Sequence, residues 1–114
     1  MGMLYRADEP SQWAARYGNG KVYLPGEPNQ PVVTYNSEGG FHLPGDKQEH
    51  GYVKEGKVYN MGDPNSPIGH YGEGEIYNTG KPSNPVATYK EDSEGEDELG
   101  AAAAYWYFRH KKKF

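Results

Sequence analysis

Apolar and polar residues alternate along residues 1–89 in short runs that glycine and proline interrupt. In one typical stretch the pair Val22 and Tyr23 is followed by a glycine- and proline-containing segment, and alternation then resumes through residues 32–35. Such runs suit half-buried strands, and the segments between them suit turns. No window between these breakers is long enough for a stable helix. The pattern therefore predicts about ten short antiparallel strands.

One unit recurs along this region. Three segments align directly, separated by 36 and 18 positions: GKVYLPGEPNQPVVTY from Gly20, GKVYNMGDPNSPIGHY from Gly56 and GEIYNTGKPSNPVATY from Gly74. The segment from Gly2 fits the same period, with Trp13 where the other copies have a proline, and a copy from Gly39 fills the remaining interval. A fixed period is typical of repeat architectures. We therefore expect an all-β fold of five tandem β-hairpins of about 18 residues each.

The repeated positions also predict which residues face inward. One position is apolar in every copy, and successive strand residues point to opposite faces, so we expect these residues to form the inner layer. They are Leu4, Val22, Phe41, Val58 and Ile76. Hairpins in a row leave two free edges, which are removed if the first and last units pair. We therefore expect a closed ring or barrel, whose interior at this strand number needs a filler.

Tandem short hairpins, glycine turns and a small apolar C-terminal tail resemble the β-flower proteins, a bacterial group in which hairpin petals radiate around a shallow closed sheet. The resemblance covers residues 2–89 and extends loosely to the tail GAAAA at residues 100–104. The third unit departs from the pattern, because His42 replaces a tyrosine and Val53 stands where another is expected. The resemblance implies this fold, no established reaction, and a likeness to tubby-type barrels, which enclose a helix and act at membranes.

Composition narrows the classes of function. The chain has no cysteine, which excludes disulfides, thiolate metal sites and cysteine nucleophiles. The four histidines occupy different positions of the unit and have no carboxylate at ligand spacing, so we expect no metal and no cofactor. No nucleophile stands beside a base, which predicts that the protein is not an enzyme. The N-terminal sequence lacks the pattern of a secretory signal, from which we expect a cytoplasmic protein.

Charge divides the chain into three parts. The net charge is −4, with −3 in residues 1–89, −5 in residues 90–98 and +4 in the basic tail. We interpret these parts as a hairpin domain (1–89), an acidic linker (90–98) and an apolar, basic C-terminal segment (99–114). Because the repeats are acidic, nucleic acid is not an expected partner.

The C-terminal segment LGAAAAYWYFRHKKKF has two possible roles. As a helix its ten uncharged residues would span about 15 Å, half the thickness of a bilayer core, so it cannot cross a membrane alone. It could lie at an anionic membrane surface, where aromatic and basic side chains bind together. The residues predicted to make this contact are Tyr105, Trp106, Tyr107, Phe108, Arg109, Lys111, Lys112 and Lys113. Alternatively, its slim alanine stretch could fill the centre of the ring as a short helix.

The tyrosines repeated in the hairpin units are a second set of candidate binding residues. Four copies carry a tyrosine directly after the inner apolar residue, at Tyr5, Tyr23, Tyr59 and Tyr77. Exposed rings in this arrangement could stack on a carbohydrate or on a choline-like cation, although we favour packing between hairpins as their role. The sequence thus favours a non-catalytic binding or membrane-peripheral module, with a repeat protein that binds a small ligand as the alternative.

Overall fold

The computed structural model describes residues 2–27, 29–81, 83–91 and 98–111. Within these residues ten strands are followed by one helix. They are β1 (Gly2–Arg6), β2 (Glu9–Gly18), β3 (Lys21–Tyr23), β4 (Val33–Tyr35), β5 (Gly40–His42), β6 (Glu49–Lys54), β7 (Lys57–Asn60), β8 (Gly69–Gly72), β9 (Glu75–Asn78), β10 (Ala87–Glu91) and α1 (Leu99–His110).

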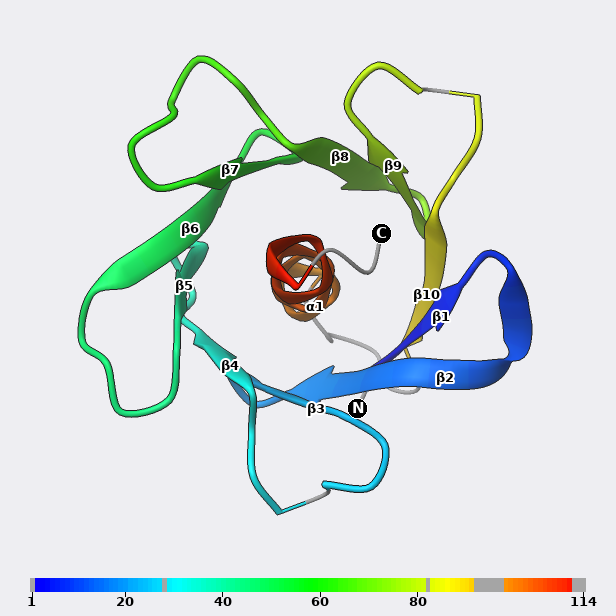
Figure 1. The fold of residues 1–114 in the computed structure, drawn as a ribbon, viewed down its shortest axis with the longest axis horizontal. Coiled ribbons are helices and arrows are strands. Elements are labelled where there is room, and N and C mark those ends of the chain that lie inside the picture. Colours follow the sequence, from blue (N-terminus) through cyan, green and yellow to red (C-terminus); the bar gives the residue numbers. More distant parts are fainter. Residues whose placement is uncertain (1, 28, 82, 92–97, 112–114) are drawn as a thin grey trace.

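The strands form one closed antiparallel barrel. Each strand pairs with its neighbours in the sequence, and β1 also pairs with β10, from Gly2 opposite Glu91 to Arg6 opposite Ala87 (Figure 1). Because the first and last strands pair, the described sheet has no open edge at which another chain could add a strand. The predicted closed, antiparallel, mostly β architecture with a short C-terminal helix is confirmed.

Tight turns join several of these strands. Two residues separate β2 from β3, β6 from β7, and β8 from β9, and in each turn both residues have positive φ. In the first, φ is 54° at Asn19 and 79° at Gly20. Positive φ at both positions is the geometry of a type I′ turn, whose twist matches that of an antiparallel strand pair. A glycine at the second position therefore fixes the register of the strands on either side.

The inner layer predicted from the sequence is confirmed. Leu4, Val22, Phe41, Val58 and Ile76 are all fully buried. A second set of inward residues is also buried and comes from the strands that pair with them. It comprises Ala15, Tyr17, Val33, Tyr35, Ala87 and Tyr89. The core is therefore built by alternate residues of the strands, as the two-residue period of a strand requires.

Helix α1 occupies the space that the sheet encloses. Figure 1 shows it end-on in the middle of the ring, and it contacts strands around most of the circumference, from β1 to β4 and at β6 and β7. Residues Gly100 to Trp106 and Phe108 are buried. An element of four alanines is narrow enough to fit a lumen already lined by side chains, so the barrel and the helix share one core.

Candidate functional site: the helix in the lumen and its exposed end

The N-terminal half of α1 depends on small residues for its fit. A Cβ at Gly100 would lie 2.2 Å from Cδ2 of Tyr17 and 2.7 Å from the hydroxyl oxygen of Tyr35, closer than real side chains approach. Ala101 to Ala104 are all fully buried. At this end, the aromatic side chains therefore belong to the barrel and the small residues to the helix.

The C-terminal half of α1 reverses this arrangement. Tyr105 and Trp106 are large, and the barrel leaves room for them with glycines. A Cβ at Gly69 would lie 2.2 Å from the Tyr105 hydroxyl oxygen, and one at Gly51 would lie 2.5 Å from Nε1 of Trp106. The lumen is therefore shaped for one orientation and one rotation of this helix.

The polar tips of these two rings have specific partners. The Tyr105 hydroxyl lies 2.6 Å from Oδ1 of Asn78 and 3.1 Å from the carbonyl oxygen of Ile68. The indole N–H of Trp106 donates to Oδ1 of Asn60 at 2.8 Å. Such bonds are needed in a core, because a buried N–H or O–H without a partner is costly.

Burial also keeps the Tyr105 hydroxyl protonated to a higher pH than usual. Desolvation raises the pKa of this phenol to about 12, and the nearby positive charge of Arg109 acts in the opposite direction. The hydroxyl is therefore protonated at neutral pH and donates its hydrogen bond. At the other end of α1, the Tyr89 hydroxyl bonds the carboxylate of Glu98, the residue that precedes the helix.

This arrangement corrects part of the predicted membrane contact. Tyr105 is 0%, Trp106 2% and Phe108 9% exposed, because these rings pack inside the barrel. In this conformation they are not available at the surface. Lys112 and Lys113 lie outside the described residues, as do residues 92–97 of the predicted acidic linker.

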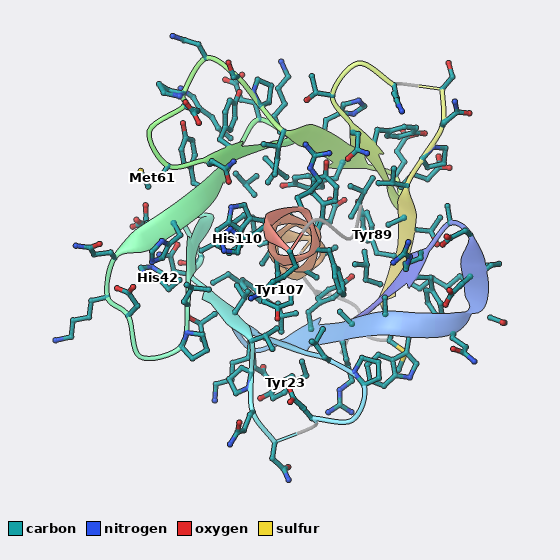
Figure 2. The ribbon with its side chains drawn as sticks, in the orientation of Figure 1. Tyr23, His42, Met61, Tyr89, Tyr107 and His110 are labelled. Carbon is teal, nitrogen blue, oxygen red and sulfur yellow. The ribbon has the colours of Figure 1, made fainter. Side chains whose placement is uncertain are left out.

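Three residues of the predicted contact, Tyr107, Arg109 and Lys111, stay accessible at the end of α1, beside His110, which was not predicted. Tyr107 and Arg109 are half-buried, and His110 and Lys111 are exposed. Figure 2 shows Tyr107 and His110 beside the helix within the outline of the ring. The ring of His110 stacks on Trp106, with centroids 5.5 Å apart and planes 12° apart, and Nζ of Lys111 lies 5.8 Å from the centroid of Tyr107. An aromatic and cationic cluster thus forms one end of the plugged lumen.

The four outer tyrosines proposed for ligand stacking do not form one joint site. They lie half-buried on the outside of the barrel, where Figure 2 shows Tyr23 beyond the ribbon of β3. Three have a cross-strand neighbour against the ring: Tyr52 stacks on Tyr59 at 5.0 Å, His70 stacks on Tyr77 at 4.9 Å, and the guanidinium of Arg16 lies 5.7 Å from Tyr23. The fourth, Tyr5, pairs in register with Trp13 and Thr88. Each tyrosine therefore packs against its own neighbours, as the packing interpretation expects.

The histidines are also placed individually. His50 Nε2 lies 2.9 Å from the Asp46 carboxylate on the third hairpin. The backbone N–H of Gln48, and then the bond to His50, lower the pKa of Asp46. His70 and His110 stack on aromatic rings. Within the described residues, no three histidine or acidic side chains come together as a metal site would require.

Sequence reasoning missed the residues that recognise the helix. Asn60 and Asn78 follow the outer tyrosine in the last two units, where the second unit has Leu24. Because they stand two positions after the inward residues Val58 and Ile76, they share the inner face. A polar residue at an inward position is a signal that its partner is a buried polar group, but the sequence does not identify the partner.

Comparison of the chain with protein-family models, curated proteins and solved structures found no match. Among the described residues, no helix has the length and apolar character needed to cross a membrane.

Proposed function

We propose that this protein is a five-hairpin barrel of the β-flower type. On this proposal it acts as a non-catalytic module that binds anionic membrane surfaces through the exposed end of α1. The contact set is Tyr107, Arg109, His110 and Lys111. Compared with the set predicted from the sequence, it gains His110 and omits Tyr105, Trp106 and Phe108, whose rings are buried in the barrel. Lys112 and Lys113 of that set lie outside the described residues.

The repeat count is supported by equivalent positions of the sheet. Type I′ turns at residues 55–56 and 73–74 are 18 positions apart, and the turn at residues 19–20 lies 36 positions before the first of these. The backbone N–H of Tyr35, Tyr71 and Tyr89 bonds the carbonyl of Gly20, Gly56 and Gly74 respectively, at 2.9 Å each time. Matching hydrogen bonds at matching intervals are what copies of one hairpin would produce.

The observation that carries the binding proposal is the separation of charge. The chain has a net charge of −4, yet the described end of α1 presents Arg109 and Lys111 beside the half-buried ring of Tyr107. Aromatic and basic side chains together favour the interface of a membrane that carries anionic lipid. The same cations also lie at the negative end of the helix dipole. Their attraction to this end stabilises the helix without any ligand.

The non-catalytic part of the proposal is supported by the ionisable groups. Among the described residues, three groups have a displaced pKa: that of Asp46 is lowered, and those of Tyr77 and Tyr105 are raised. Each of these three groups therefore keeps its usual protonation state at neutral pH. None of the three is tuned toward the neutral pKa that a general acid or base would use.

Vesicle sedimentation tests the binding. The full chain should bind vesicles that contain phosphatidylserine and should bind much less to vesicles of phosphatidylcholine alone, with weaker binding at high salt. Arg109→Gln with Lys111→Gln removes two cations worth about 1 kcal/mol each near such a surface, so partitioning should fall about 30-fold. Lys54→Gln with Lys57→Gln removes the same charge from exposed positions on β6 and β7 and should change partitioning little. Equal losses in both double variants, or no binding by the original chain, would reject the proposal.

Ligand stacking on the outer tyrosines is the second candidate. It is favoured by the half-exposed rings of Tyr59 and Tyr77, whose planes are held parallel to a neighbouring ring within 10° and 15°. A preordered ring costs less entropy when it binds a sugar or a choline-like cation. Tyr59→Ala and Tyr23→Ala should then abolish glycan-array binding, and unchanged binding would reject this use.

A further inference from the structure

The first hairpin differs from the others where Trp13 replaces the proline of the other aligned units. Its second strand, β2, runs from Glu9 to Gly18 and is longer than any other described strand. The pairing with β1 is irregular there: Leu4 lies opposite Ala15, Tyr5 opposite Trp13 and Arg6 opposite Glu9. Three residues between Glu9 and Trp13 thus have no partner on β1 and bulge from the ladder. Such bulges redirect side chains and are frequent beside binding sites.

Trp13 is not explained by the hydrophobic core. It lies opposite Tyr5, which follows the fully buried Leu4, so both rings point to the outer face. In the described part of the chain, Trp13 is not among the side chains that form the core or pack against it. It is only half-buried. A large half-buried ring at such a position leaves part of its apolar surface within reach of a ligand.

A hollow of about 400 Å³ lies against this ring. Ser11, Gln12 and Trp13 line it from the first hairpin, and Pro25 lines it from the loop that follows β3. This volume is that of a small-molecule site, and the hollow is open to solvent rather than enclosed. Ser11 and Gln12 are exposed, and among the described residues neither side chain bonds another residue. The hollow therefore combines one aromatic platform with an exposed hydroxyl and an exposed amide.

We propose that this hollow, here named the Trp13 hollow, binds a neutral saccharide. The apolar face of a sugar ring can stack on the indole of Trp13. The hydroxyl groups of the sugar can hydrogen-bond to Ser11 and Gln12. A quaternary ammonium ion favours a cage of several rings, and a proline-rich peptide favours a groove lined by several aromatic residues. The Trp13 hollow has one ring, and its four lining residues carry no charge. This site is independent of the membrane contact at α1 and distinct from Tyr59 and Tyr77, which lie on β7 and β9.

Titration of the full chain tests the site, because the two tryptophans report separately. Trp13 lines the hollow, whereas Trp106 is 2% exposed inside the barrel. The indole N–H signals can be assigned by NMR with Trp13→Phe, and cellotriose is the probe. We expect a saturable shift of the Trp13 signal, with a Kd of about 1 mM, and no shift of Trp106. Trp13→Ala, monitored on the backbone signals of Ser11 and Gln12, should weaken binding at least about tenfold.

Gln12→Ala is the second variant and keeps the test informative if Trp13→Ala does not fold. It should weaken cellotriose binding, whereas Gln30→Ala, an exposed glutamine outside the hollow, should leave it unchanged. Tyr59→Ala should also leave it unchanged. The proposal is overturned if cellotriose shifts neither indole signal or shifts both alike. It is also overturned if Tyr59→Ala abolishes the shift of the Trp13 signal, or if tetramethylammonium shifts that signal and cellotriose does not.

Discussion

Single residues decide how the helix fits the barrel. Gly51 and Gly69 leave space for Trp106 and Tyr105, and Gly100 leaves space for Tyr17. None of these three glycines has the positive φ that makes glycine necessary in a turn. They are therefore required by packing, and a single methyl group is enough to disturb them.

Gly69→Ala tests this packing. The new Cβ would lie 2.2 Å from the Tyr105 hydroxyl oxygen and 2.5 Å from the backbone oxygen of Tyr77, so we expect a loss of about 1–3 kcal/mol in the free energy of unfolding. Gly72→Ala lies on the same strand with no atom within 4 Å and should be neutral or slightly stabilising. Urea denaturation followed by circular dichroism measures both. Equal stability of the two variants would contradict the fit described here.

Tyr105 should make stability depend on pH in the alkaline range. Folding raises the pKa of this phenol from 10.0 to about 12, because burial penalises the anion. The contribution of Tyr105 to the free energy of unfolding is therefore fully present below pH 10 and is lost as the pH rises from 10 to 12, a total of about 2–3 kcal/mol. Urea denaturation at a series of pH values should show this loss in the original chain. Tyr105→Phe should be less stable than the original chain at pH 8, and its free energy of unfolding should fall less between pH 8 and pH 11.5. If the free energies of unfolding of the two chains fall in parallel with pH, Tyr105 is not the group responsible.

At the scale of elements, α1 and the barrel wall are complementary along their length. Gly100 lies against barrel tyrosines at one end of the helix, and helix aromatics face barrel glycines and asparagines at the other. The hydrogen bonds of Trp106 and Tyr105 go to different strands, β7 and β9, so they fix the rotation of the helix as well as its depth.

Removing one acceptor should show the value of this match. Asn60→Ala leaves the indole N–H of Trp106 buried without its acceptor, which should cost about 1–3 kcal/mol of unfolding free energy. Asn84→Ala, at an exposed position, is the matched control and should cost little. Combining Asn60→Ala with Trp106→Phe gives a double-mutant cycle that isolates the bond. A coupling energy near zero would mean that the bond does not stabilise docking.

The sequence predicted the elements better than their contacts. Glycine turns and alternating residues located the strands around Val22, Val58 and Ile76, and the four alanines identified the helix, because these are local preferences. The candidate contact residues were only partly predictable. Tyr105, Trp106 and Phe108 have the composition of an interfacial segment, and their burial depends on a lumen built by residues far away in the chain.

At the scale of the whole molecule, the closed sheet and the helix share one hydrophobic core. The seam between β1 and β10 joins the two ends of the sheet, and the core includes residues from the sheet and from α1. Without the helix, the fully buried residues Val22, Val33 and Val58 would face an unfilled lumen. Cavities of that kind cost stability in proportion to the volume left empty.

Truncation tests whether the unit is cooperative. A chain that ends at Glu98 should lose the cooperative thermal transition of the full chain, measured by calorimetry and near-ultraviolet circular dichroism. A chain that ends at Lys111 keeps all of α1 and should melt nearly as the full chain does. An unchanged transition in the shorter chain would show that the helix is not needed for folding.

The sequence by itself determined the strands, the turns, the inward residues and the helix-forming tail, because each depends on neighbours within a few positions. The tertiary structure alone decided which groups remain available for binding. It buried three predicted contact residues in the lumen, left Tyr107, Arg109 and Lys111 at its end, and opened a hollow beside Trp13 between two hairpins. The reason is physical: burial depends on which distant surfaces meet when the barrel closes, and local sequence preferences do not contain that information.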